Sequence, residues 1–598
     1  MAQLTIENFM SIRNVKNPVY VPQGKKLNFI SDASGLPQIW EINPETRNPV
    51  QVLETAERIM FVSFIPGTGK RIFGMDEGVN EKQQLFLLTE TGEVIRLTDS
   101  PEHIHKYGGV SPDGKWISWA SNRRHNTYFD IYIQSLESFE VKMVFRGDGN
   151  FSPLLWHPEG NSLLIEQVNT NLDNDLGLLD LSGGTVQWLT KHDGEAAFAS
   201  PAFSSDGKVL YLLSNRDREF MNLASLDLET LATQWLVGKE WDLEELKLSP
   251  DKKKMAFSIN EGGVSKGALF DPESNEVREW ESPAGVITDF AFSPDNSRLA
   301  FVLNGPQHPP DIWELDLRSL KAKRATFISH DPVVEEKLCA PELISFASFD
   351  GLEVPAFYYK PKKADGKLPV VVFVHGGPES QIRAAFNPFL QFFLNKGFAV
   401  CTPNVRGSTG YYGKSFTHLD DVRKRMDSVR DLVHLVDWLK TEGGADGDQI
   451  SIMGRSYGGF MVLAAITHYP DIWSSAIDIV GISSFRTFLQ NTSPWRRKMR
   501  EAEYGSIEKD GAFFDEIDPL HKTEKIQCPL LVLHGANDPR VPIEETEQIV
   551  EDLKNRKHPV EYIRFEDEGH FFVKRENNIK AYTASWDFLK EYSGRIKL

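Results

Sequence analysis

One serine of this chain stands in a setting that could make it a nucleophile. Gly454-Arg455-Ser456-Tyr457-Gly458 fits the pattern G-x-S-x-G, with a short apolar segment before it and an apolar run of helical length after it. At such a strand–turn–helix corner only glycine-sized neighbours let the backbone pass, and the serine hydroxyl is left exposed above the sheet. The pentapeptide alone is a weak signal. With its flanking strand and helix it marks a candidate nucleophile, against the alternative of a tight glycine turn.

A serine hydroxyl needs a base to activate it, and the base needs an acid to orient it. Asp538 follows the apolar run "PLLVLHGAN" and His570 follows "VEYIRFEDEG", so both come directly after predicted strands. Serine, acid and histidine in this order, each at the end of a strand, is the layout of the α/β-hydrolase fold. The acids at 566–568 precede His570 too closely to reach behind its imidazole, and we expect His534 to pack or hydrogen-bond locally.

Acyl transfer also needs backbone N–H groups that hold the oxyanion of the tetrahedral intermediate. His375-Gly376-Gly377-Pro378 follows the strand-like run "VVVFV", where this fold provides one such donor. We assign that role to Gly377 rather than Gly376, with a glycine that only permits a tight loop as the alternative. The second donor is the N–H of Tyr457, directly after the candidate nucleophile.

The first half of the chain repeats a turn-and-strand phrase with a period of about 45 residues, which is typical of β-propeller blades. The clearest copy, "SPDGKWISWASN", begins with S-P-D-G, a type I turn composition in which proline fixes φ and glycine closes the turn. The seven copies begin at Val21, Ile65, Ser111, His157, Ser204, Ser249 and Ser293. They predict a seven-bladed β-propeller over residues 1–328, in which residues 1–20 could pack on the second domain.

Beyond residue 328, apolar strand-like runs alternate with helix-length patterns. In residues 427–440 one helical face carries Val429, Leu432, Val433, Val436 and Leu439, the usual core-facing stripe. Fully apolar strands that alternate with such helices indicate a mostly parallel sheet covered on both faces. We therefore expect an α/β-hydrolase catalytic domain over residues 329–598.

Composition narrows the class of protein. A chain of 598 residues is too long for one core, and a net charge of −19 argues against nucleic acid as a main partner. The three cysteines are far apart, so neither a disulfide framework nor a zinc site is expected, and no cofactor is indicated. The chain does not open with a basic start and an apolar stretch, and no run of about 20 apolar residues occurs. We therefore expect a cytoplasmic protein without a membrane partner.

Together, the seven-unit repeat and five motifs in order resemble the prolyl oligopeptidase family of serine peptidases, and most closely its acylaminoacyl-peptidase branch. The motifs are HGGP at 375–378, NVRGSTG at 404–410, GRSYGG at 454–459, DPRVP at 538–542 and EGH at 568–570. The resemblance covers essentially the whole chain and implies that the candidate serine, acid and histidine form a catalytic triad. It also implies that Arg540 holds a peptide carbonyl of the substrate. The alternative is a surface arginine paired with Glu544 or Glu545.

The resemblance further implies short peptide substrates, because a propeller over the site would exclude folded proteins. Release of an N-acylated amino acid is the first expected activity, and a broader oligopeptidase, a dipeptidyl peptidase or a carboxylesterase with the same triad are alternatives. A dipeptidyl peptidase would need buried acids for the free α-amine of its substrate, and the pair Glu335-Glu336 falls in the expected linker instead. A propeller scaffold with a degenerate hydrolase is the non-enzymatic alternative. Exposed strand edges could pair subunits, so a homo-oligomer stays open.

Overall fold

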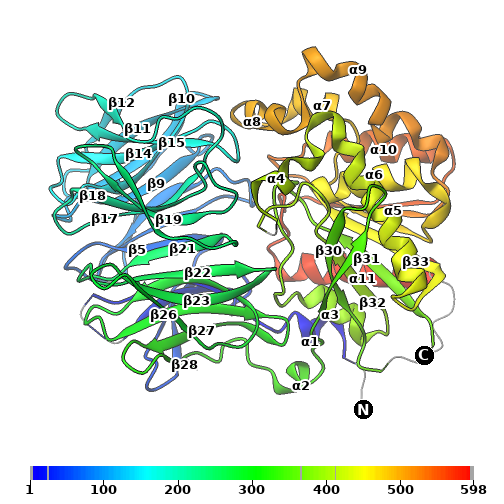
Figure 1. Ribbon diagram of the computed structural model, residues 1–598, viewed down its shortest axis with the longest axis horizontal. Helices are drawn as coiled ribbons and strands as arrows, with labels where there is room; N and C mark the ends of the chain where they lie inside the picture. Colours follow the sequence, from blue (N-terminus) through cyan, green and yellow to red (C-terminus); the bar gives the residue numbers. More distant parts are fainter. Residues whose placement is uncertain (1–3, 23, 25, 364–365, 411, 593–598) are drawn as a thin grey trace.

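The computed structural model describes residues 4–22, 24, 26–363, 366–410 and 412–592. Figure 1 shows two bodies side by side, a ring of antiparallel sheets and a layered body in which helices flank a mixed sheet. The predicted combination of a seven-bladed β-propeller and an α/β-hydrolase domain is confirmed by this strand pairing. Among the described residues, no helix has both the length and the apolar character needed to cross a membrane.

In the described part of the chain, seven blades of four antiparallel strands form the ring, and the strands of each blade pair in chain order. A single parallel pairing between β11 and β13 joins the third and fourth blades into one sheet. The first blade contains β1 (Val15–Tyr20), β2 (Leu27–Ser31), β3 (Gln38–Ile42) and β4 (Pro49–Leu53). The second contains β5 (Ile59–Phe64), β6 (Arg71–Met75), β7 (Gln84–Leu88) and β8 (Val94–Arg96). The third contains β9 (His105–Val110), β10 (Trp116–His125), β11 (Tyr128–Ser135) and β12 (Val141–Phe145). The fourth and fifth contain β13 (Asn150–Trp156), β14 (Ser162–Val168), β15 (Asn174–Asp180) and β16 (Val186–Trp188); and β17 (Phe198–Phe203), β18 (Val209–Ser214), β19 (Asn222–Asp227) and β20 (Thr233–Val237). The last two contain β21 (Leu243–Leu248), β22 (Met255–Glu261), β23 (Val264–Asp271) and β24 (Glu276–Trp280); and β25 (Val286–Phe292), β26 (Arg298–Gly305), β27 (His308–Asp316) and β28 (Lys321–Arg324).

The repeated corner joins the first and second strands of each blade, and its own side chains stabilise it. In the third blade Ser111 Oγ donates to Asp113 Oδ1 (2.6 Å) and accepts from the Trp116 N–H (2.9 Å). Gly114 takes a φ of +72°, which favours glycine. The same serine-to-aspartate hydrogen bond recurs in the fifth, sixth and seventh blades. The corner thus satisfies its polar groups locally, and the next strand is free to alternate between the two faces of its sheet.

The second body is built on an eight-stranded sheet in the order β29-β30-β32-β31-β33-β34-β35-β36. β30 pairs antiparallel with both β29 and β32, and the remaining pairs are parallel. The strands are β29 (Glu342–Ala347), β30 (Glu353–Tyr359), β31 (Leu368–Val374), β32 (Ala399–Pro403), β33 (Ala445–Arg455), β34 (Ala476–Ile479), β35 (Leu530–Gly535) and β36 (Val560–Phe565). The carboxyl ends of the parallel strands meet at one edge of the sheet, which is where such folds place their sites.

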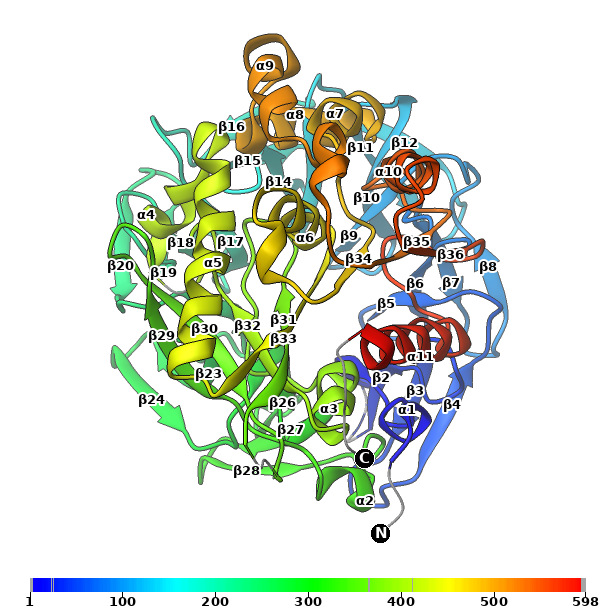
Figure 2. The ribbon, with the colours of Figure 1, turned by 90° about the vertical axis from the view of Figure 1, so that its right-hand side faces the viewer.

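Helices cover both faces of this sheet. Val370 and Val372 of β31 belong to one hydrophobic core and Val371 to the other, because successive side chains of a strand point to opposite faces. The helices are α1 (Ile6–Phe9), α2 (Pro332–Glu335), α3 (Pro388–Asn395), α4 (Gly413–Thr417), α5 (Arg425–Thr441), α6 (Tyr457–His468), α7 (Phe485–Asn491), α8 (Pro494–Tyr504), α9 (Ile507–Ile517), α10 (Glu544–Asn555) and α11 (Arg575–Tyr592), with 3-10 turns η1 (His418–Asp420), η2 (Val422–Lys424), η3 (Pro470–Ile472) and η4 (Pro519–Lys525). Figure 2 shows α1, α3 and α11 close together on one side of the sheet.

The first described helix belongs to the second body although it precedes the propeller. Phe9 of α1 is fully buried, and its ring lies 6.1 Å from that of Phe392 on α3. The chain then enters the ring at β1 and leaves it at β28, and α2 brings Val334 into the same core. The propeller is therefore inserted between two segments that both pack on the catalytic sheet.

Candidate active site

Ser456 stands at the corner where the chain turns from β33 into α6. Its φ is +61° and its ψ is −122°, a conformation that costs a non-glycine residue about 1–3 kcal/mol. Glycines allow the close approach around it. A Cβ on Gly458 would lie 2.2 Å from the Val374 carbonyl oxygen, and one on Gly454 would lie 2.2 Å from the Gly458 oxygen. These strained and crowded features are what a G-x-S-x-G corner requires.

His570 and Asp538 meet in a buried hydrogen bond. His570 Nδ1 lies 2.6 Å from Asp538 Oδ2, and the two side chains are 3% and 0% exposed. The other carboxylate oxygen, Oδ1, accepts the N–H groups of Arg540 (2.8 Å) and Val541 (3.1 Å). Arg455 Nη1 donates to the His570 carbonyl oxygen (2.9 Å), which ties the histidine loop to the serine corner. Backbone N–H groups therefore fix the Asp538 carboxylate, and the carboxylate in turn orients the His570 imidazole.

Burial and pairing shift the ionisation of both side chains. Burial acts to raise the pKa of Asp538, but the charge and the hydrogen bond of His570 outweigh it and lower that pKa below its usual range. Burial also lowers the pKa of His570, against the opposing effect of Asp538. Asp538 is therefore a carboxylate at pH 7 and His570 is neutral. Its Nδ1 carries the proton toward Asp538, which leaves the Nε2 lone pair able to accept one.

The competing acids and histidine near His570 have other partners. Glu568 accepts two backbone N–H groups of the following turn, and Asp567 forms an ion pair with Lys574. His534 is fully buried, with its ring nitrogens 2.7 Å from a threonine hydroxyl and 3.1 Å from a backbone carbonyl. Burial lowers the pKa of His534 to about 4, so it is neutral. These side chains support the local fold, as the sequence predicts for His534.

Ser456 and His570 line one cavity of about 280 Å³. Part of its wall is apolar and part is basic. Its lining comprises Gly376, Gly377, Ser380, Arg455, Ser456, Ile482, Phe488, Arg496, Arg500, Tyr504, Arg540, Val541, His570 and Phe571. The structure thus gives the candidate nucleophile and the candidate base a shared space in which a small peptide segment fits.

The loop after β31 passes directly over Ser456. A Cβ on Gly376 would lie 2.8 Å from the Arg455 carbonyl oxygen and 3.1 Å from Ser456 Cβ. Gly377 follows with a φ of +137°, and its carbonyl oxygen accepts from Tyr504 Oη (3.2 Å). On the other side of the corner, Tyr457 is the first residue of α6, so its N–H has no partner within the helix. Both residues assigned as oxyanion donors lie at the corner, and their roles stay predictions.

Arg540 lies in the same wall and reaches across to the propeller. Its Nε donates to Glu81 Oε1 of the second blade (2.7 Å), and its guanidinium carbon lies 5.1 Å from the centre of the Phe571 ring. The described ion-pair partner of Arg540 is Glu81 rather than Glu544 or Glu545, and Glu545 is buried among serine and threonine donors. The arginine is therefore held at the boundary between the two bodies. The role of Arg540 toward a substrate carbonyl stays a prediction.

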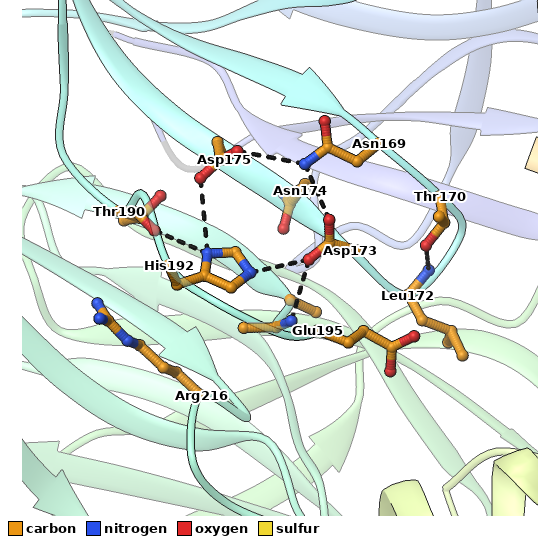
Figure 3. Close-up of polar contacts among 12 residues, drawn as sticks. Asn169, Thr170, Leu172, Asp173, Asn174, Asp175, Thr190, His192, Glu195 and Arg216 are labelled. Carbon is orange, nitrogen blue, oxygen red and sulfur yellow. Dashed lines mark hydrogen bonds and ion pairs between the residues drawn. The ribbon is translucent and has the colours of Figure 1, made fainter.

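A hairpin loop of the fourth blade also reaches this region. Asn171, between β14 and β15, donates from Nδ2 to Glu379 Oε2 in the loop after β31. Figure 3 shows how the base of the hairpin is held: His192 lies between two carboxylates, 2.8 Å from Asp173 and 3.5 Å from Asp175. A propeller loop with a fixed base therefore positions a side chain beside the predicted oxyanion loop.

A second polar contact joins the two bodies at η1. His418 Nδ1 lies 2.8 Å from Asp421 Oδ2, and its Nε2 lies 2.9 Å from Glu195 Oε1 of the propeller. The hydrogen bonds to Asp421 and Glu195 raise the pKa of His418 to about 10. Lys414 Nζ also donates to the Glu195 carbonyl oxygen (2.7 Å). At pH 7 this imidazole is therefore a cation shared by two carboxylates.

Behind Tyr457 lies a buried ionic cluster for which the sequence carries no motif. Arg425 of α5 forms ion pairs with Asp420 and Glu503, and its Nη1 donates to Tyr457 Oη (3.1 Å). The carboxylates of Asp420, Asp421 and Glu503 lie within 4.8 Å of one another, a donor set of the kind that binds cations. Here the guanidinium already supplies positive charge to two of the three. The cluster therefore serves to fix the residue after Ser456.

Comparisons with known proteins cover both bodies. Residues 384–595 match the profile of the Prolyl oligopeptidase family. The chain is 28% identical over 588 residues to Dipeptidyl aminopeptidase BIII of Pseudoxanthomonas mexicana, covering 94% of this chain and 84% of that protein. It is 24% identical over 683 residues to the uncharacterized peptidase YuxL of Bacillus subtilis, covering 95% of each.

Solved structures share the fold along the whole chain. A puromycin-hydrolyzing peptidase of Mycobacterium tuberculosis superposes with a TM-score of 0.87 at 20% identity, covering 100% of this chain and 97% of that one. An acylaminoacyl peptidase of Pyrococcus horikoshii superposes with a TM-score of 0.75 at 19% identity, covering 100% and 98%. At such identities the likeness establishes the arrangement of the two bodies and not a substrate.

Proposed function

We propose that this chain, which belongs to the prolyl oligopeptidase family of serine peptidases, cleaves short peptides. In this proposal Ser456 is the nucleophile, His570 is the general base, and Asp538 is the acid that orients the base. The observation that carries the proposal is the 2.6 Å contact between His570 Nδ1 and Asp538 Oδ2, with the imidazole on the wall of the cavity that Ser456 also lines.

The proposed reaction is acyl transfer in two halves. His570 Nε2 takes the Ser456 proton as the oxygen attacks the scissile carbonyl, and Asp538 stabilises the imidazolium that forms. The N–H groups of Gly377 and Tyr457 hold the oxyanion. The imidazolium then protonates the leaving amine, and the acyl group stays on the serine. Water, activated by the same histidine, releases the acyl group and restores the enzyme.

Contacts between the two bodies support short substrates. Arg540 binds Glu81, and Glu379 binds Asn171, so propeller residues lie directly against the loops of the site. Entry of a folded protein would require unfolding it, which costs about 5–15 kcal/mol. Peptides that are already flexible avoid that cost. In this proposal Arg540 keeps its expected role as the donor to a substrate carbonyl.

The finer proposal is that the enzyme releases N-acylated amino acids from such peptides. The resemblance of its sequence motifs to the acylaminoacyl-peptidase branch supports it. A dipeptidyl aminopeptidase is the second candidate, because a relative with that name aligns over 94% of this chain. Glu379 favours this second candidate, since it is an acid beside the predicted oxyanion loop that could face a free α-amine.

One panel of substrates tests these proposals. It compares turnover of an acetyl-amino-acid anilide, a free-amine dipeptide anilide and a short-chain ester by the intact chain and by Ser456→Ala. Preference for the acetylated anilide supports the first candidate, and preference for the free amine supports the second. Turnover of the ester alone indicates a carboxylesterase. If Ser456→Ala retains the activity of the intact chain, the proposed mechanism is refuted.

The cytoplasm remains our proposed compartment, and a homo-oligomer remains a prediction. The first follows from the expectations drawn from composition, and the second from strand edges that could pair between subunits. Cell fractionation and light scattering of the purified chain test them separately. Recovery in a membrane or secreted fraction would contradict the first, and a monomeric mass would contradict the second.

A further inference from the structure

Helix α8 presents a basic stripe to the Ser456 cavity. Arg496, Arg500 and Tyr504 follow each other at four-residue spacing, so they share one face of the helix, and all three line the cavity. Figure 1 shows α8 where the hydrolase body meets the propeller, and the Trp495 ring lies 5.9 Å from that of Phe129 in the third blade. The stripe is therefore carried by a helix that touches both bodies.

The two glutamates in the second half of α8 form ion pairs with arginines that are not part of the stripe. Glu501 pairs with Arg497 at 2.8 Å on the outer side of the helix, and Glu503 pairs with the buried Arg425. Arg497 is in turn 3.5 Å from a glutamate of the next helix. Within the described part of the chain, no carboxylate forms an ion pair with either arginine of the stripe. Two guanidinium groups therefore line the cavity with no carboxylate in direct ion-pair contact among the described residues.

The surroundings of the stripe compensate its positive charge only in part. Arg500 Nη1 makes a 3.4 Å contact with the Gly377 carbonyl oxygen, which is uncharged. Burial and the neighbouring charges of Arg500 and Arg540 lower the pKa of Arg496 to about 9, although the carboxylates of Glu81 and Asp538 act in the opposite direction. Burial and the proximity of Glu503 raise the pKa of Glu379 to about 7, although the charge of Arg500 acts in the opposite direction. An anion that entered the cavity would relieve the repulsion among these arginines.

We propose that the Ser456 cavity binds a carboxylate of the substrate between Arg496 and Arg500, so that this enzyme prefers anionic short peptides. The inference rests on the proposed peptidase function and names its substrate class. A guanidinium matches the planar carboxylate with two parallel N–H donors, which gives direction as well as charge. The carboxylate comes either from an acidic side chain beside the scissile bond or from the C-terminus of a very short peptide.

Two matched pairs of substrates separate these two sources. The first pair is an Ala-Glu anilide and an Ala-Gln anilide, and the second is tri-alanine with a free C-terminal carboxylate and its C-terminal amide. All four carry the amino-terminal group that the panel above favours. We expect the charged member of at least one pair to have a kcat/KM about 10- to 100-fold higher, the usual value of a hydrogen bond to a charged group.

Variants of α8 test whether the stripe causes this preference. Arg496→Gln and Arg500→Gln should each lower the charged-to-neutral ratio at least about tenfold. Arg497→Gln is the matched control, because it lies on the same helix and points to the outer side, and its ratio should equal that of the intact chain. A ratio near one in both pairs overturns the inference, and so does a ratio that neither stripe variant changes.

A binding measurement keeps this inference separate from the proposed function. Calorimetry with Ser456→Ala compares the C-terminal amides of N-acetyl-Ala-Glu and N-acetyl-Ala-Gln, and it compares N-acetyl-tri-alanine with its C-terminal amide. The charged member of at least one pair should bind about tenfold more tightly or better. Equal affinity within both pairs overturns the carboxylate site even if peptides are cleaved. Tighter binding of the charged member by a chain that cleaves no peptide supports the site and refutes the proposed function.

Discussion

The substitution Asp538→Asn tests the proposed triad most directly, because it removes charge at nearly constant shape. Asp538 Oδ1 accepts two backbone N–H groups, from Arg540 and Val541, and Oδ2 faces His570 Nδ1 at 2.6 Å. The asparagine oxygen must stay on the backbone side, since turning the amide would leave two buried N–H groups facing an NH₂. The NH₂ group then faces Nδ1, which has to accept, so the imidazole proton moves to Nε2. In that tautomer His570 cannot take the Ser456 proton.

The size of the effect follows from the two backbone hydrogen bonds. Each unsatisfied buried N–H costs about 1–3 kcal/mol, so the productive orientation lies about 2–6 kcal/mol above the other. This corresponds to a loss in kcat of about 30- to 20,000-fold. The assay is kcat on the best anilide at pH 8, with Asp567→Asn as control because Asp567 is half exposed and pairs with Lys574. A loss below tenfold in a variant with an unchanged melting temperature would refute the assignment of Asp538.

Further predictions concern the serine, the base and the contact between the two bodies. Ser456→Ala should lower kcat by at least about 10⁴-fold without lowering the melting temperature, and residual turnover above that level contradicts the nucleophile. Because burial lowers the pKa of His570 and its neutral form is the base, the acid limb of kcat/KM against pH should lie below 6.5; a limb above pH 7 would show a different base. His418 has a folded pKa of about 10 against 6.5 for a free histidine, so its contribution to stability is complete below pH 6.5 and is lost as the pH rises through 10. After discounting for partial exposure, the contribution of His418 to the free energy of unfolding amounts to about 1 kcal/mol. The melting temperature of the intact chain should therefore fall more between pH 8 and 10.5 than that of His418→Ala. If the melting temperatures of the two proteins fall in parallel with pH, the role of this histidine is contradicted.

Features that depend on local chemistry could be predicted from the sequence. The blade repeat is visible because each corner satisfies its own hydrogen bonds, as Ser111 and Asp113 show, so the same residues recur wherever the corner does. The G-x-S-x-G corner is visible because Gly454 and Gly458 admit no side chain there. The same holds for Asp538 and its motif, since two of its hydrogen bonds go to residues two and three positions later.

Contacts between segments that are distant in the sequence could not be predicted from local sequence patterns. The pairing of Arg540 with Glu81 and that of Asn171 with Glu379 join residues hundreds of positions apart, and nothing near either residue signals its partner. Helix α5 shows the limit of a hydrophobic pattern. The pattern places Val433 on the core face, but this side chain is only half-buried. The pattern also gives no sign that Asp431 is buried, because its partner, Arg406, lies elsewhere in the chain.

The insertion of the propeller between α1 and α2 sets how the two bodies can separate. Both connecting segments anchor in one core, through Phe9 and Val334, so the ring is fastened to the catalytic body along a single edge. β14, β15 and α8 lie at the other end of the interface (Figure 1). This tether restricts any separation of the two bodies to a rotation about α1 and α2, with α8 on the side where the distance between them would grow most. The hydrogen bond between Asn171 and Glu379 lies on that side and would have to break in such a rotation.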